Sequence, residues 1–304
     1  MTPSRAPVLR AETEAAWPRG EPPSLTTVAD LLRWRPARGP LVAWCDAFDD
    51  HLERCAGGGR VLDRSAPWSW TAPETTLEDT GIAVDTAGAF AFPDDEPGHA
   101  ATRPHTGPEL AIAIRRLRTA VAALRRASPP ALEFVTAFTD VLALRANPGP
   151  ARFHSSTFPG FVGLVRFTNA HLAGVDTAAI IEALVREAIH GILHVHEQVQ
   201  GPLVRPTHAS CKIMSPWSGA TIELRSYVHA CAIWYGIHHL WSLHGFASGE
   251  IGERAETLRQ RARAGFDHRP VSFRLAPFAH LLAPGVRHLL WEFEERVLSS
   301  GPGR

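Results

Sequence analysis

The sequence predicts a mainly α-helical fold with a few short β-strands. Apolar residues recur at helical spacing in long segments, the clearest of which are 109–126, 177–200 and 220–244. Strand propensity is confined to short apolar runs, which are 81–84, 88–92 and 161–167. We expect the segments 177–200 and 220–244 to be two long antiparallel helices that form the functional site.

The N-terminal part of the chain is predicted to be helical at first and irregular afterwards. The spacing of apolar residues predicts one helix that begins at Thr26 or Thr27 and a second helix over 41–55. Residues 60–107 lack helical periodicity and are rich in Pro, Asp, Thr and Gly. We therefore predict an N-terminal helical and irregular region over 1–107.

The remaining elements are predicted to form one helical domain over 108–304. Proline and glycine mark the helix ends, because proline fixes φ and lacks the backbone N–H that a helix interior requires. The predicted helices are 109–126, 132–146, 177–200, 220–244, 251–264 and 277–298. The predicted loops are 153–160 and 201–216.

Composition and charge limit the classes of function. The chain has 304 residues, of which 45% are hydrophobic and 20% are charged, as is typical of a globular protein with a sizeable core. The net charge is zero with His neutral, so neither a nucleic-acid nor a membrane-surface partner is expected. The sequence has no apolar run of about 18 residues and no signal-peptide pattern, so we expect a cytoplasmic protein.

Polar residues form a stripe on the otherwise apolar helix 177–200. Arg186, His190 and His194 follow one another at four-residue spacing, which places them on one helical face, and Glu187 lies beside them. A metal site needs two or three ligands around a common point. His229, on the next long helix, is the candidate for a third ligand. The alternative is that these histidines are buried packing or hydrogen-bonding residues.

The segment 185–190 (VREAIH) resembles the VHExxH helix of the bacterial HExxH-type peptide-modification proteins. Further segments agree in order and spacing: Ser-Ser at 155–156 with Pro-Gly at 159–160, Ser-Pro-Trp at 215–217, and His-Ala at 229–230. The resemblance covers about residues 108–245. It implies, for some members of the family, Fe(II)- and α-ketoglutarate-dependent β-hydroxylation of a ribosomally made precursor peptide.

The chain departs from this family at the first motif histidine, which is Arg186 here. Arginine has no free lone pair to donate, so it cannot be a metal ligand. One interpretation keeps an altered Fe(II) site, with His190 and His229 completed by His194 or Glu187. In a second, no cofactor is bound: Arg186 takes the place of the cation and pairs with Glu187, and His190 or His229 acts as acid or base. In a third, the chain is a non-catalytic homologue that binds a precursor peptide or a partner enzyme.

Two further residues are candidates for binding a co-substrate. Arg225 lies four residues before His229 on the same helical face, where it could hold the carboxylate of α-ketoglutarate or of a peptide. It could instead pair with Glu187 or Glu223. Trp217 could form a wall of the site or serve as a packing anchor. A precursor peptide is the expected partner, and homodimerisation is left open.

Two other histidine-containing segments are predicted to lie outside the site. His196 and Glu197 begin the string HEQVQ, whose position near a helix end predicts exposure to solvent. His238 and His239 are predicted to pack or to face solvent, because His238 lies two and a half helical turns from His229.

Overall fold

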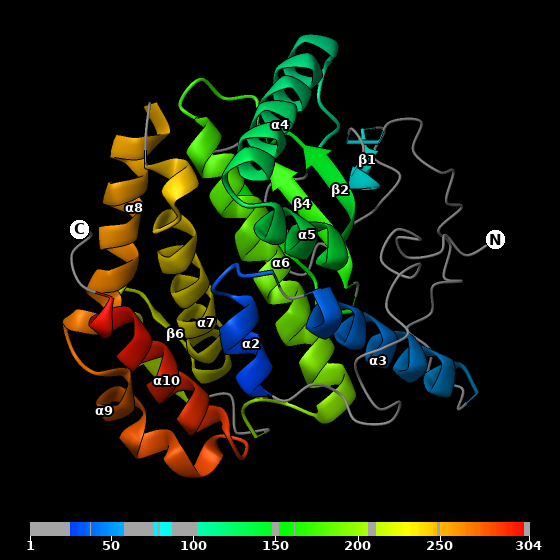
Figure 1. Ribbon diagram of the computed structural model, residues 1–304. Coiled ribbons are helices and arrows are strands. Elements are labelled where there is room, and N and C mark those ends of the chain that lie inside the picture. Colours follow the sequence, from blue (N-terminus) through cyan, green and yellow to red (C-terminus); the bar gives the residue numbers. More distant parts are fainter. Residues whose placement is uncertain are drawn as a thin grey trace. The chain divides into compact units, whose positions relative to one another are not determined.

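The computed structural model describes residues 25–36, 38–57, 76–77, 80–86, 102–147, 152–160, 162–205, 211–247 and 250–300 (Figure 1). Across these residues the protein is mainly helical with a few short strands, which confirms the predicted fold class. The chain divides into two compact units. The first comprises residues 1–14 and 49–191, and the second comprises residues 15–48 and 192–304. The division at residue 107 stays a prediction.

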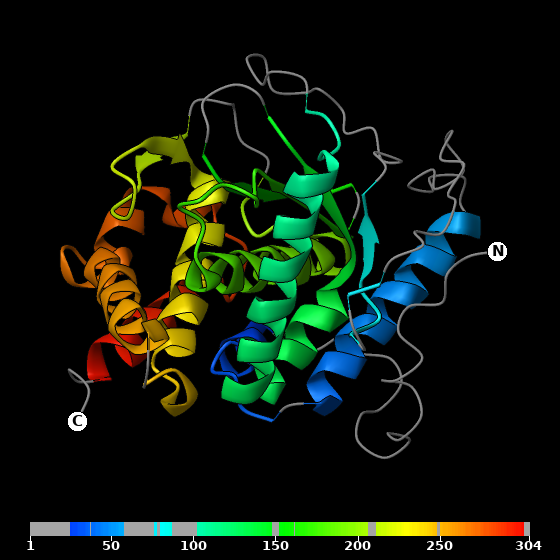
Figure 2. The same ribbon diagram turned by 90° about the horizontal axis from the view of Figure 1, so that it is seen from above.

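The first unit contains a four-stranded sheet in the order β1-β2-β4-β3. In Figure 2, β1 (cyan) lies beside the green strands of this sheet. Its strands are β1 (Ala83–Asp85), β2 (Thr139–Arg145), β3 (His154–Thr157) and β4 (Gly163–Thr168). Strand β2 pairs in parallel with β1 and β4, whereas β3 runs antiparallel to β4. Arg145 and Asp85 form an ion pair at 2.5 Å, and both side chains are buried. This pair joins the two neighbouring strands inside the core of the unit.

Strand β2 occupies a segment that the sequence pattern predicts to be helical. The predicted helix 132–146 is wrong beyond residue 138, because helix α5 (Pro129–Phe138) ends there and the chain continues directly as β2. The apolar run 141–144 is ambiguous, since a strand in the middle of a parallel sheet is buried on both faces and shows no alternation. The predicted loop 153–160 is also wrong at 154–157, where the chain forms the outer strand β3.

Other predictions for this unit are confirmed. Helix α4 (Gly107–Ala127) corresponds to the predicted helix 109–126. The predicted strands 81–84 and 161–167 correspond to β1 and β4 within two residues at each end. The predicted strand 88–92 lies outside the described residues. Helix α4 packs on α5, which in turn contacts β2.

Helices α4 and α6 begin at side chains that satisfy free backbone N–H groups. At α4, the Thr106 N–H donates to the Glu109 carboxylate at 2.8 Å as part of a capping box. Helix α6 (Thr177–Gln200) has the predicted bounds, and the Asp176 carboxylate accepts a hydrogen bond from the Ala179 N–H at 2.7 Å. The helix is therefore defined at its start by the local sequence.

Gly191 in α6 lies in close contact with the end of α5. A Cβ atom at this position would lie 2.9 Å from Phe138 Cβ and 3.2 Å from Phe138 O. We expect Gly191→Ala to lower the free energy of unfolding by about 1–3 kcal/mol through overpacking, offset in part by the roughly 1 kcal/mol of helix propensity that alanine gains. Urea unfolding measures the change. Gly174→Ala is the control, because it has open space around its Cβ; equal effects of both substitutions would contradict the steric argument.

The second unit is a helical assembly that includes the other predicted site helix. Its elements are α2 (Leu25–Leu31), the start of α3 (Arg38–Gly57), the end of α6, β5 (Lys212–Met214), β6 (Thr221–Glu223), α7 (Leu224–Trp241), η2 (His244–Phe246), α8 (Glu250–Asp267), α9 (Val271–Leu275), η3 (Ala276–Leu281) and α10 (Val286–Ser299). Helix α7 packs on α8 and α10. Two hydrogen bonds tie α7 to the N-terminal segment: Trp34 Nε1 donates to Gly236 O at 2.9 Å, and the Tyr235 hydroxyl donates to Ala29 O at 3.1 Å.

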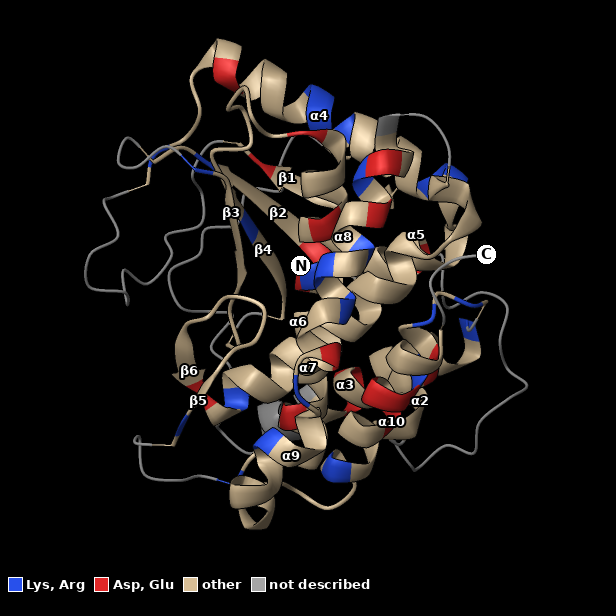
Figure 3. Cartoon of the chain, turned by 90° about the vertical axis from the view of Figure 1, so that its left-hand side faces the viewer, with Lys and Arg blue, Asp and Glu red and all other residues tan. Residues whose placement is uncertain are grey.

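The helices predicted from Thr26, over 41–55 and over 251–264 correspond to α2, α3 and α8. Helix α7 begins later than the predicted helix 220–244, because residues 221–223 pair with β5 as strand β6. It also ends earlier, at Trp241. The predicted helix 277–298 is wrong before residue 286, where Gly285 has φ of 82° and precedes α10. Both acidic and basic residues occur along α8 (Figure 3).

Candidate metal centre

Helix α6 presents His190 and His194 one turn apart on the same face. His194 is buried and His190 is half-buried. The neighbouring apolar residues Ile189, Ile192 and Leu193 are all buried as well. Imidazoles in such surroundings require polar partners, because leaving their nitrogens without hydrogen bonds or metal would cost free energy.

Helix α7 contributes His229, which is buried. The ring of His229 lies beside that of His194, with their centroids 5.3 Å apart. Backbone hydrogen bonds and the packing of α7 on α8 and α10 fix the helix that carries it. His194 and His229, which lie within one compact unit, therefore come together although 35 residues separate them in the sequence.

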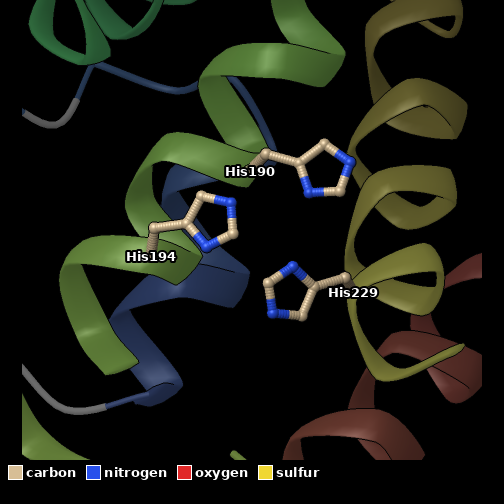
Figure 4. Close-up of side chains that lie close together, drawn as sticks. All are labelled: His190, His194 and His229. Carbon is tan, nitrogen blue, oxygen red and sulfur yellow. The ribbon is translucent and has the colours of Figure 1, made fainter. Parts of the chain in front are cut away.

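His190, His194 and His229 form a group with the arrangement of a metal site. Each offers one ring nitrogen, and these three atoms all lie within 4.8 Å of one another. In Figure 4, one nitrogen of each ring points toward a common centre. Among the described residues this is the group of histidine, cysteine and carboxylate side chains that could hold a metal ion. The three correspond to one of the two ligand sets expected for an altered metal site, the one in which His194 and not Glu187 completes the site.

Glu197 supplies a carboxylate beside two of these histidines. Its Oε2 atom lies 3.3 Å from His229 Nε2 and 3.7 Å from His194 Nδ1. Arg225 Nε donates to both carboxylate oxygens, at 2.9 Å and 3.1 Å, and Arg225 Nη2 donates to Oε2.

The electrostatics keep this carboxylate charged and His229 neutral. Burial raises the pKa of Glu197, but the nearby His194, His229 and Arg225 side chains lower it by more, so that it lies well below its usual range. The pKa of Arg225 is raised, chiefly by its hydrogen bonds to Glu197. The pKa of His229 is lowered, chiefly by burial. A neutral imidazole retains the lone pair that a metal ion needs.

Arg186 and Glu187 form a separate polar group with Ser155 in the first unit. Glu187 is buried and accepts hydrogen bonds from Ser155 Oγ at 2.6 Å and from Arg186 Nε at 3.0 Å. Arg186 also donates from Nη2 to Ser155 O at 3.3 Å and to Ser155 Oγ. The predicted pairing of Arg186 with Glu187 is therefore confirmed. The Ser-Ser segment at 155–156 contributes to this group through Ser155.

Trp217 packs against α8. Its Nε1 donates to Ala262 O at 2.9 Å, and its ring stacks on that of Trp234 with centroids 5.8 Å apart and an interplanar angle of 14°. It also contacts Phe266 edge to face. These contacts are those of the packing anchor, which was one of its two predicted roles.

The sequence pattern missed Glu197 as the partner of Arg225 and was wrong to place His196 and Glu197 at the surface. His196 is 4% exposed and lies against the Trp44 ring, with centroids 5.8 Å apart. The Glu197 side chain is 9% exposed. The direct ion pair of Arg225 is with Glu197, not with Glu187 or Glu223. One sequence feature pointed to this: Glu197 follows His194 by three residues, so both lie on one helical face.

No known family model matches the sequence, and no curated protein matches it at a significant level. Within the described part of the chain, no helix combines the length and the apolar character needed to span a membrane.

Proposed function

We propose that the chain is a metal-dependent enzyme that tailors a ribosomally made precursor peptide, with His190, His194 and His229 as its metal ligands. The observation that carries the metal site is the convergence of three imidazole nitrogens within 4.8 Å of one another. The peptide substrate and the tailoring reaction rest on the resemblance of 185–190 and its flanking segments to the HExxH-type peptide-modification proteins. A cytoplasmic location belongs to the same proposal, because ribosomally made peptides are synthesised there.

The donor set fits a divalent transition metal. Neutral imidazoles are good ligands for iron and zinc, and three protein ligands leave coordination positions for water or substrate. A bound Fe(II) would supply the oxygen activation that hydroxylation requires. The chain's own contribution is to bring three ring nitrogens within 4.8 Å of one another.

Arg225 does not fit as a free anchor for α-ketoglutarate. Its Nε and Nη2 groups are hydrogen-bonded to Glu197, so its positive charge already has an anionic partner. α-Ketoglutarate remains part of the proposal through the family resemblance alone. Succinate formation from α-ketoglutarate by the Fe(II)-loaded protein, with and without a candidate peptide, tests this part separately.

A metal-independent enzyme is the second candidate, and the Ser155–Arg186–Glu187 group favours it. The guanidinium and the buried carboxylate are held together by hydrogen bonds, as expected if Arg186 has replaced a cation. In that case His190 or His229 would act as acid or base. This candidate predicts activity that chelators leave unchanged and that Arg186→Ala abolishes.

Metal content after anaerobic reconstitution with Fe(II), measured by elemental mass spectrometry, tests the main proposal. We expect about one iron per chain, because the three histidines make one site. Chelator treatment should remove the iron and any turnover together. A protein without bound metal would contradict the proposal, and peptide binding without turnover in every variant would indicate a non-catalytic homologue.

A further inference from the structure

We propose that the outer face of α4 docks an acidic helix of a partner polypeptide. Three arginines form this surface, which we call the arginine stripe: Arg115, Arg118 and Arg126. All three lie on one helix of the first unit, and none belongs to the three-histidine group. The docking surface therefore does not depend on the proposed metal function.

The arginine stripe runs along one side of α4. Given the number of residues per helical turn, its three members fall within an arc of about 80° around the helix axis and span roughly 16 Å along it. All three are exposed, and Figure 3 shows blue, basic positions on α4. The opposite side of the helix is buried in the core through Leu117, Val121 and Leu124. The apolar side thus fixes α4 in the fold and leaves the basic side open to a partner.

The positive charges of the arginine stripe lack acidic partners within the fold. Glu109 is the single acidic residue of α4, and it pairs with Arg103 and accepts from the Thr106 N–H at the start of the helix. Glu133 is the single acidic residue of α5, the helix packed on α4. Among the described residues, no ion pair joins either carboxylate, or any other, to a guanidinium of the stripe. An external anion can therefore bind these guanidiniums without breaking an existing pair.

Arg116, next to the stripe, has a structural role that the stripe residues lack. It is half-buried, and its Nη1 donates to Ala170 O at 2.8 Å and to Leu172 O at 2.5 Å. Burial lowers the pKa of Arg116, and the charge of Arg115 lowers it further. Arg115 and Arg118 lie three residues apart on one face, and like charges at this spacing destabilise a helix. Carboxylates of a bound partner would offset this repulsion.

The composition of the surface favours an acidic helix over a nucleic acid or a membrane. The chain has no net charge, whereas surfaces that bind nucleic acid usually belong to basic domains. The residues that share the arc with the arginines are small: Ala111, Thr119 and Ala122. They offer no aromatic ring for base stacking and no bulky apolar group for insertion into lipid. Small side chains instead let a second helix lie close, where glutamates three and four residues apart can reach the guanidiniums.

Fluorescence anisotropy with two labelled, alanine-rich helical peptides tests the surface. The acidic probe carries glutamates three and four residues apart on one face, and the neutral probe carries glutamines at the same positions. We expect the wild type to bind the acidic probe more tightly than the neutral one, and added salt to weaken this binding. The triple variant Arg115→Gln/Arg118→Gln/Arg126→Gln should lose about tenfold in affinity for the acidic probe, because each exposed ion pair contributes a few-fold. Glutamine is a good helix former, so the circular dichroism should stay that of the wild type.

The matched control removes three exposed positive charges from other parts of the chain, in Arg152→Gln/Arg269→Gln/Arg287→Gln. It should bind the acidic probe as the wild type does. Equal losses in the two triple variants would overturn the proposal, because they would show attraction by overall charge alone. A wild type that binds both probes alike would overturn it too. Duplex DNA or phosphatidylserine vesicles that bind the wild type more tightly than the acidic probe, and lose this binding in the stripe variant, would show that an acidic helix is the wrong partner.

Discussion

Replacement of His229 by glutamine is expected to weaken Zn(II) binding by more than about 100-fold. Loss of a residue that only supports a ligand already costs roughly 10–100-fold in metal affinity, and here the ligand itself is removed. His229 is the single contribution of α7 to the three-histidine group, whereas α6 provides both His190 and His194. Two histidines on one helix do not enclose a metal ion, so the effect should be large.

Competition with a chromophoric chelator measures the Zn(II) affinity, and circular dichroism shows that the variant keeps its helices. His244→Gln is the control, since His244 is exposed just beyond the end of α7. We expect the control to bind Zn(II) as the wild type does, and His194→Gln to behave like His229→Gln. Equal affinities of wild type and His229→Gln would show that the metal, if any, lies elsewhere.

The part of the site on α6 could be predicted from the sequence because it is local. Four-residue spacing places His190 and His194 on one face of any helix, and the α6 bounds follow from apolar periodicity and the cap at Asp176. The pairing of Arg186 with Glu187 is equally local, between neighbours in the sequence.

Glu197 could not be predicted, because its role depends on which side chains of α7 lie beside it. Position near a helix end is usually associated with exposure, but Arg225 and His229 cover the carboxylate from another helix. The same limit explains the error at 139–145. Whether a short apolar run becomes a helix or a buried strand is decided by its neighbours, here β1 and β4, which lie far away in the sequence.

Acidification from pH 7.5 to pH 5 is expected to lower the free energy of unfolding by about 4 kcal/mol through His238 and His239 alone. Burial lowers the pKa of His238 to about 4, and the positive charges of Arg259 and Arg263 lower it as well. A backbone hydrogen bond at Arg259 raises this pKa in part. The charge of Asp267 also raises it. Burial also lowers the pKa of His239 to about 3.

Cationic surroundings reinforce the effect at His239. Arg33, Arg35 and Arg296 lower its pKa further, as does His238 beside it. The sign follows from proton uptake: in the unfolded chain both imidazoles titrate near pH 6.5, whereas in the folded protein they stay neutral down to about pH 4 and pH 3. Between pH 6.5 and these lower values the unfolded state binds more protons than the folded state. The contribution of the two neutral imidazoles to the free energy of unfolding is therefore fully present above pH 6.5 and is lost as the pH falls.

Urea unfolding at several pH values, with chelator present so that no metal contributes, measures this slope. His238→Gln keeps a polar group near Ser300 but cannot take up a proton, so it should reduce the loss between pH 7.5 and pH 5 by about 2 kcal/mol. His268→Gln is the control: His268 is exposed, so this substitution should leave the slope unchanged.

An unfolding free energy that stays constant between pH 7.5 and pH 5 would mean that His238 and His239 take up protons in the folded protein as they do in the unfolded chain, with carboxylates or water reaching them. The same slope in His238→Gln and wild type would instead assign the loss to other buried histidines, such as His196 and His105, whose pKa values burial also lowers to about 4.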